Sequence, residues 1–149
     1  MSAQRRAVLL ASLGGALGVR PAAAALPDAL QVAVRAFTGG AALRSGPGRV
    51  VLEIETLVDN GNVVPVRVSV QSPMTAAEHV RRIALFTERN PQPEVLVFHL
   101  GPRSGRAAVA TRIRLATSQQ VLAVAELSDG TCWQHAVEVV VTLAACIEG

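Results

Sequence analysis

The sequence predicts an all-β fold: an immunoglobulin-like β-sandwich of about seven strands, preceded by a short N-terminal helix. From Arg49 onward, short β-branched runs are separated by turn residues, a pattern typical of a sandwich rather than of alternating helices and strands. The 149 residues are half apolar, which is enough for one domain with a substantial core. Because aromatic side chains are few, we expect that core to consist of Val, Leu, Ile and Ala.

Residues 1–25 have the features of a signal peptide. A charged start with Arg5 and Arg6 is followed by an apolar stretch and a small-residue end, PAAAAL. The paired arginines resemble a twin-arginine (Tat) signal, although Gln4 and Val8 depart from that pattern, and an ordinary secretory signal is the alternative. The apolar stretch is short and interrupted by glycines, which favours removal over a retained membrane anchor. We therefore expect an exported, periplasmic protein.

The charge of the chain depends on this leader. All fourteen basic residues are arginines, and the formal net charge is +3. Three arginines lie in the leader, which has no acidic residue, so its removal leaves eleven basic residues against eleven acidic ones. No basic patch interleaved with aromatic residues remains, and we expect no nucleic-acid partner.

The first element of the mature chain is an amphipathic helix over 27–37. Leu30, Ala33, Val34 and Phe37 fall on one helical face, and Gly39-Gly40 follows it. We assign 26–48 to this helix and a linker, 49–143 to the sandwich and 144–149 to a C-terminal arm. The predicted strands are 49–56, 63–70, 82–88, 95–100, 107–115, 120–127 and 131–143.

Turn chemistry separates these strands. The stretch 59–62 (Asp-Asn-Gly-Asn) predicts a turn, and Ser128-Asp129-Gly130 predicts a hairpin. Pro65 indicates an edge strand or a bulge, because proline cannot donate to a sheet ladder. In the connection 74–82 we expect one helical turn.

Alternation in the last strand assigns its side chains to two faces. Trp133, His135 and Val137 fall on the side expected to face the core, and Cys132 and Gln134 fall on the other. We interpret His135 as a structural histidine with satisfied hydrogen bonds. The three histidines share no metal-ligand spacing, so we expect no metal site.

Two cysteines in an exported protein suggest a disulfide. However, Cys132 opens the last strand and Cys146 lies beyond its end, roughly 35 Å away at about 3.3 Å per residue. A disulfide needs Cα atoms within about 7 Å, so we expect no bond between them. Cys146 on a free chain end is then the candidate functional thiol, and a dispensable terminal thiol is the alternative. No catalytic base accompanies it, which indicates a carrier rather than an enzyme and leaves no catalytic residue to name.

Two long runs and the terminal cysteine resemble the SoxY family of sulfur carriers in thiosulfate oxidation. The runs are NGNVVPVRVSVQSPM and ERNPQPEVLVFHLGPRSGRAAVATRIRLATSQQVLAVAELSDG, and the resemblance extends from about Gly48 to Cys146. It implies an immunoglobulin-like sandwich with Cys146 as the covalent sulfur attachment site and no cofactor of its own. The resemblance assigns no function to Cys132; we interpret it as a partly buried or incidental thiol, with an intermolecular disulfide in a homodimer as the alternative.

The resemblance also implies partners. A smaller SoxZ-like subunit would form a heterodimer with the chain. A haem c enzyme would join thiosulfate to the thiol, a manganese-dependent hydrolase would release sulfate, and a molybdenum sulfur dehydrogenase would oxidise the remaining sulfane.

The tail departs from the family pattern. Members usually end Gly-Gly-Cys-Gly-Gly, whereas this chain ends AACIEG. Alanine stiffens the arm, Ile147 adds bulk beside the thiol, and Glu148 disfavours both the thiolate and an approaching dianion. Two alternatives to a thiosulfate carrier therefore stay open: a divergent carrier for another sulfur species or oxidoreductase system, and a non-catalytic binding module in which Cys146 is idle.

Overall fold

The computed structural model describes residues 26–143. The predicted signal peptide, 1–25, and the predicted arm with Cys146, 144–149, lie outside these described residues. One helix, one 3-10 turn and nine strands follow in order. They are α1 (Asp28–Thr38), β1 (Leu43–Ser45), β2 (Val50–Ile54), β3 (Leu57–Asn60), β4 (Val64–Val70), β5 (Val80–Thr87), β6 (Glu94–His99), η1 (Pro102–Ser104), β7 (Ala108–Ile113), β8 (Gln119–Leu127) and β9 (Cys132–Leu143).

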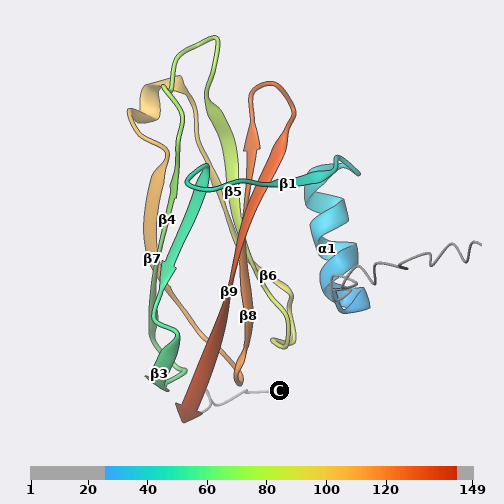
Figure 1. Ribbon diagram of the computed structural model, residues 1–149, viewed down its shortest axis with the longest axis vertical. Helices are drawn as coiled ribbons and strands as arrows, with labels where there is room; N and C mark the ends of the chain where they lie inside the picture. Colours follow the sequence, from blue (N-terminus) through green and yellow to red (C-terminus); the bar gives the residue numbers. More distant parts are fainter. Residues whose placement is uncertain (1–25, 144–149) are drawn as a thin grey trace, which may run out of the picture.

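The strands form two sheets packed face to face (Figure 1). The larger has the order β1-β9-β8-β5-β6, with β3 added to β9, and the smaller has the order β2-β4-β7. Strand β9 is the longest, at 12 residues, and joins β8 through the predicted hairpin at Ser128-Asp129-Gly130. The predicted all-β sandwich is confirmed, with nine strands in place of about seven.

The main core lies between the sheets and consists largely of aliphatic side chains, as expected. In β4 the four valines point into the core, and the more exposed residues between them point away from it. This matches the predicted period of two. Val64 and Val68 are fully buried, and Ile83, Leu85 and Leu115 of other segments are buried in the same cluster. The core is thus filled by closely packed branched aliphatic side chains, although the chain has few aromatic residues.

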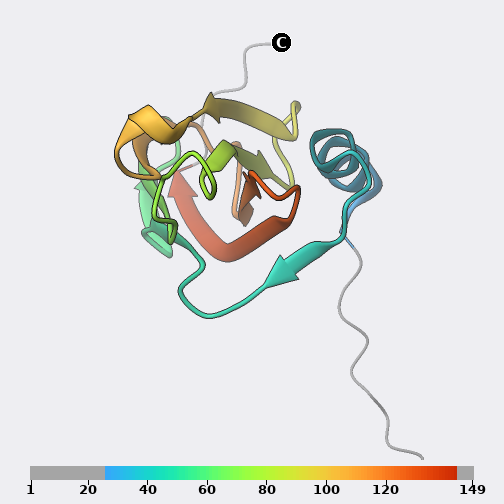
Figure 2. The same cartoon turned by 90° about the horizontal axis from the view of Figure 1, so that it is seen from above.

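A second, smaller core lies on the outer face of the larger sheet, beneath α1 (Figure 2). Leu30, Val34 and Phe37 are buried on the helix, as its amphipathic pattern predicts. The ring of Phe37 meets that of Phe86 edge to face, with 5.8 Å between the centroids. Gly39 ends the helix in the left-handed conformation, at φ 62°, which a residue without a Cβ adopts at no steric cost.

Arg82 fastens the helix to the sheet. Its guanidinium donates to the carbonyl oxygen of Phe37 at 2.9 Å, lies 4.3 Å from the centroid of the Phe37 ring, and forms an ion pair with Glu126. One side chain thereby ties the last turn of α1 to both β5 and β8. In the part of the chain that the structure describes, no helix is long and apolar enough to cross a membrane.

The two additional strands arise from segments without a strand pattern. β1 has three residues and pairs in parallel with the start of β9, inside the predicted linker. β3 overlaps the predicted turn at 59–62 and pairs in parallel with the end of β9. Both are held by pairing with a long strand from the far end of the sequence, which short-range periodicity cannot reveal.

Two local predictions are wrong. Pro65 does not mark an edge strand, because β4 lies between β2 and β7. The proline is tolerated because β2 ends at Ile54, which pairs with Val66, so Pro65 has no pairing partner on β2. No helical turn forms in 74–82, because Met74 is buried with a left-handed φ of 53° and β5 already begins at Val80.

His135 joins the two sheets where β2 faces β9. Its Nδ1 accepts the backbone N–H of Leu52 at 2.9 Å, across 83 positions of sequence. The prediction of a structural histidine is confirmed. The contact also assigns the proton of the neutral ring to Nε2, since Nδ1 must keep its lone pair.

We expect Arg82→Leu to lower the free energy of unfolding by about 1–3 kcal/mol, because it leaves Glu126 without its cation and Phe37 without a hydrogen-bond donor. Urea unfolding followed by circular dichroism measures this. Arg81→Leu is the matched control, because Arg81 is exposed, and it should change stability by less than about 0.5 kcal/mol. Equal effects of the two substitutions would contradict the role given to Arg82.

We expect His135→Ala to cost about 1–2 kcal/mol, because the N–H of Leu52 loses its acceptor at a partly buried position. His99→Ala serves as control, since His99 is exposed on β6. Thermal melting of both variants tests the expectation, which fails if the His135 variant melts with the wild type.

Candidate functional site

Strand β9 separates the two cysteines of the chain in the sequence. Cys132 is its first residue, and Cys146 follows its last residue, Leu143, by three positions. Cys146 lies outside the described residues. The structure therefore defines the environment of Cys132 and the point from which the segment bearing Cys146 departs.

Cys132 is sealed in the small core beneath α1, where it is 1% exposed. Its burial, and secondarily the charge of Glu126, raise the pKa of the thiol, while Arg82 opposes the shift. Both thiolate formation and access by a reagent are disfavoured. Cys132 was interpreted as a partly buried or incidental thiol; the structure buries it fully, so the alternative of a disulfide to a second copy would require the residues packed over it to move away.

The end of β9 is held on both edges. On one side β3 pairs with it in parallel, and the N–H of Gly61 donates to the carbonyl oxygen of Leu143 at 2.9 Å. On the other side the hydroxyl of Ser118 accepts the N–H of Val141 at 2.8 Å. The segment that carries Cys146 therefore starts from an anchored strand end, and neither β3 nor Ser118 was recognised as its support from the sequence.

This anchoring limits where Cys146 can go. Three residues span at most about 11 Å, because an extended chain covers about 3.3–3.6 Å per residue. Cys132 lies at the other end of β9, eleven positions before Leu143 and roughly 36 Å away along the strand. The two thiols of one chain therefore stay too far apart for a disulfide as long as β9 keeps its pairing.

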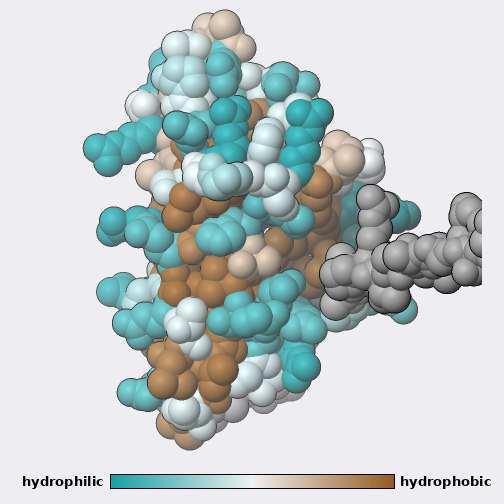
Figure 3. All heavy atoms as spheres, viewed as in Figure 1, coloured by the Kyte–Doolittle hydropathy of each residue, from teal (hydrophilic) through white to brown (hydrophobic). Residues whose placement is uncertain are grey.

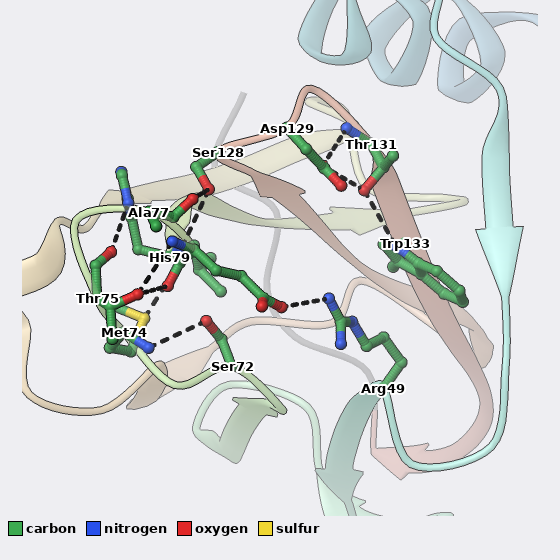
Figure 4. Close-up of polar contacts among 12 residues, drawn as sticks. Arg49, Ser72, Met74, Thr75, Ala77, His79, Ser128, Asp129, Thr131 and Trp133 are labelled. Carbon is green, nitrogen blue, oxygen red and sulfur yellow. Dashed lines mark hydrogen bonds and ion pairs between the residues drawn. The ribbon is translucent and has the colours of Figure 1, made fainter.

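The opposite end of the sandwich is tied by polar contacts between the 72–79 connection and the β8–β9 hairpin (Figure 4). The N–H of His79 donates to the Ser128 hydroxyl at 3.0 Å, and the N–H of Ser128 donates to the His79 carbonyl oxygen at 2.7 Å. Hydrogen bonds from the Thr131 hydroxyl and backbone N–H lower the pKa of Asp129. These contacts build a turn, and His79 serves it structurally.

Trp133 lies close to two arginines at the same end, a cluster that the sequence pattern did not predict. The guanidinium carbons of Arg44 and Arg49 lie 5.9 and 5.5 Å from its ring centroid. A Cβ at Gly46 would come within 3.0 Å of the ring, so the loop after β1 packs directly on the indole. Repeated arginines flanking a glycine-rich loop were the available signal, but their common partner lies almost ninety residues later.

Among residues 26–143, no group of three or more His, Cys, Asp or Glu side chains is placed to hold a metal ion. His79, His99 and His135 lie on separate elements: the connection before β5, strand β6 and strand β9. These three histidines are therefore not brought together in the fold. The end of β9 is the described part of the chain that lies nearest in sequence to the predicted attachment thiol, Cys146.

Comparison with solved structures places the fold among sulfur carriers and superoxide reductases. The SoxY sulfur carrier from Chlorobium limicola f thiosulfatophilum has a TM-score of 0.65 and 26% identity, over 77% of this chain and 97% of that one. A superoxide reductase (neelaredoxin) from Ignicoccus hospitalis has a TM-score of 0.58 and 19% identity, over 66% and 94% of the two chains. The superoxide reductase from Nanoarchaeum equitans reaches 0.55 and 13%, over 66% and 99%. At such identities the likeness to the reductases concerns the fold alone.

Comparison of sequences gives a family. No curated protein matches the chain significantly. A family model described as sulfur oxidation protein SoxY matches residues 34–146, from within α1 to Cys146 itself. This match covers most of the chain and agrees with the structural likeness to a SoxY protein. The chain therefore belongs to the SoxY family of sulfur oxidation proteins.

Proposed function

We propose that the chain is an exported, covalent sulfur carrier of thiosulfate oxidation, which holds sulfur intermediates on Cys146 and presents them to partner enzymes in the periplasm. Membership of the SoxY family and the likeness to a SoxY sulfur carrier support the carrier role. The observation that carries the assignment to Cys146 is the burial of Cys132, which leaves Cys146 as the candidate attachment thiol. The family match also ends on this cysteine.

A tethered thiol suits this chemistry. In the first step the sulfane sulfur of thiosulfate bonds to the cysteine sulfur, giving Cys–S–S–SO₃⁻ and one proton, and two electrons pass to the haem c enzyme. Hydrolysis of the terminal S–S bond by the manganese enzyme then releases sulfate and leaves a persulfide on the carrier. The covalent bond keeps that reactive group from diffusing away and raises its effective concentration at the next enzyme, a molybdenum sulfur dehydrogenase.

The partners belong to the proposal as well. A SoxZ-like subunit would complete a heterodimer, and the twin-arginine-like leader at 1–25 would export the chain to the compartment of the enzymes. In this scheme the chain itself is a substrate of its partners rather than a catalyst. Proteins exported by the twin-arginine route cross the membrane folded, which fits a carrier that travels with a bound subunit.

The carrier role predicts adducts on one cysteine only. Intact-mass analysis of mature protein from cells oxidising thiosulfate should show reductant-sensitive thiosulfonate and persulfide adducts. They should disappear in Cys146→Ser and persist in Cys132→Ser, because Cys132 is buried beneath α1. A bare thiol in every condition, together with a functional Cys146→Ser variant, would leave the binding-module interpretation in place of the carrier.

The AACIEG tail predicts slow loading. Replacing it by Gly-Gly-Cys-Gly-Gly should raise the rate of thiosulfate conjugation by roughly threefold or more, because a nearby like charge is removed and the thiol loses a bulky neighbour. The single substitution Glu148→Gln removes the charge and keeps the shape of the side chain, so its effect on the rate measures the contribution of the charge alone. Conjugation is followed by mass spectrometry with the loading enzyme and thiosulfate, and equal rates for tail variant and wild type would remove this explanation.

A further inference from the structure

Exposed apolar side chains gather at one end of the molecule. Five large apolar residues of the described chain are exposed, and four of them lie where β9 ends. These four, which we call the arm-base patch, are Leu57, Val63, Val140 and Leu143, with 60, 55, 53 and 62% of their surface exposed. Figure 3 shows apolar surface over β3 and the end of β9, at the lower end of the molecule.

The pairing of the strands explains why these four residues lie at the same end of the sheet. Leu57 and Val140 are direct partners in the parallel β3–β9 pair, so their side chains stand next to each other on one face. Leu143, three positions after Val140, lies on the opposite face by the same alternation, and the hydrogen bond from the N–H of Gly61 to its carbonyl oxygen holds the β3–β4 turn, and with it Val63, at this strand end. The patch therefore surrounds the point at which the chain leaves the sheet.

The short stretch of chain between Leu143 and Cys146 indicates what kind of partner binds this surface. Cys146 lies three residues further, so its Cα stays within about 11 Å of that of Leu143. A folded enzyme that acts on the thiol must place its own atoms within that distance of the strand end, and so against the patch. We infer that the arm-base patch is the docking surface for the enzyme that loads Cys146, an inference that rests on the proposed carrier function.

The neighbouring charges indicate the chemistry of that enzyme's surface. Alternation places Glu138 on the face of Val140, and Asp59 on the face of Leu57. The segments 55–63 and 138–143 contain three acidic residues and no basic one. The complementary surface is an apolar rim with basic groups around the entrance of a cleft, and such a rim would also attract the thiosulfate dianion.

Substitution of Val140 tests the inference, with Val32 as a matched control. Val32, the fifth exposed apolar residue, is 69% exposed on α1, away from the strand end. Purified wild type, Val140→Glu and Val32→Glu are incubated with thiosulfate and a soluble extract of the source cells, and the adduct on Cys146 is followed by intact mass. Val140→Glu should be loaded about tenfold more slowly, the factor expected when one valine is no longer buried, and Val32→Glu at the wild-type rate.

Two further measurements isolate docking from other effects. The rate of Cys146 alkylation by iodoacetamide should be the same in all three proteins, which shows that the thiol itself is unaltered. Val140→Thr keeps the β-branched shape without a charge and should be slowed in the same direction, so that the test does not depend on one variant's folding.

The outcomes separate the docking surface from the carrier function. Loading of wild type and both Val140 variants at one rate overturns the docking surface and leaves the carrier role standing. Loss of self-association or of a bound subunit in the Val140 variants, with loading unchanged, also overturns it by assigning the patch to another partner. Absence of any adduct on wild type overturns the carrier function and the docking surface together.

Discussion

The pairing of β9 is the constraint on which the structure depends. One edge of this strand pairs with β8 in eight residue pairs, and the other edge pairs first with β1 and then with β3. The strand thereby links the N-terminal helix region, the middle of the larger sheet and the base of the C-terminal segment. Its His135 also bonds to β2 of the other sheet, so both layers are held together through it.

The two faces of the larger sheet give the two thiols their different environments. Val139 of β9 is buried in the main core between the sheets, whereas Cys132 lies beneath α1 on the opposite face. A sheet covered on both faces buries every residue of its central strands, which is why β8 is buried almost throughout. The helix, anchored by Arg82, thus turns what alternation alone would make a half-exposed cysteine into a sealed one.

Helices and strands formed by local interactions could be predicted from the sequence, whereas those held by distant parts of the chain could not. Elements with a clear period were located closely: the helix from its apolar face, β4 from its alternating valines, and the β8–β9 hairpin from Ser128-Asp129-Gly130. Those held mainly by distant partners were missed, namely β1, β3 and the position of Pro65 inside a central strand. The site divides in the same way, because Cys146 stood out in the sequence, while the support from Ser118 and Gly61 required the fold.

The sequence by itself determined the fold class, the family resemblance and the three-residue distance from the strand end to Cys146, because periodicity, motif runs and covalent connectivity are local properties. Only the tertiary structure decided that Cys132 is sealed and that Leu57, Val63 and Val140 lie exposed at the same strand end as Leu143. Burial and surface clustering depend on which segments pack together across the chain, and β3 comes to lie beside β9 only through a pairing that spans about eighty residues.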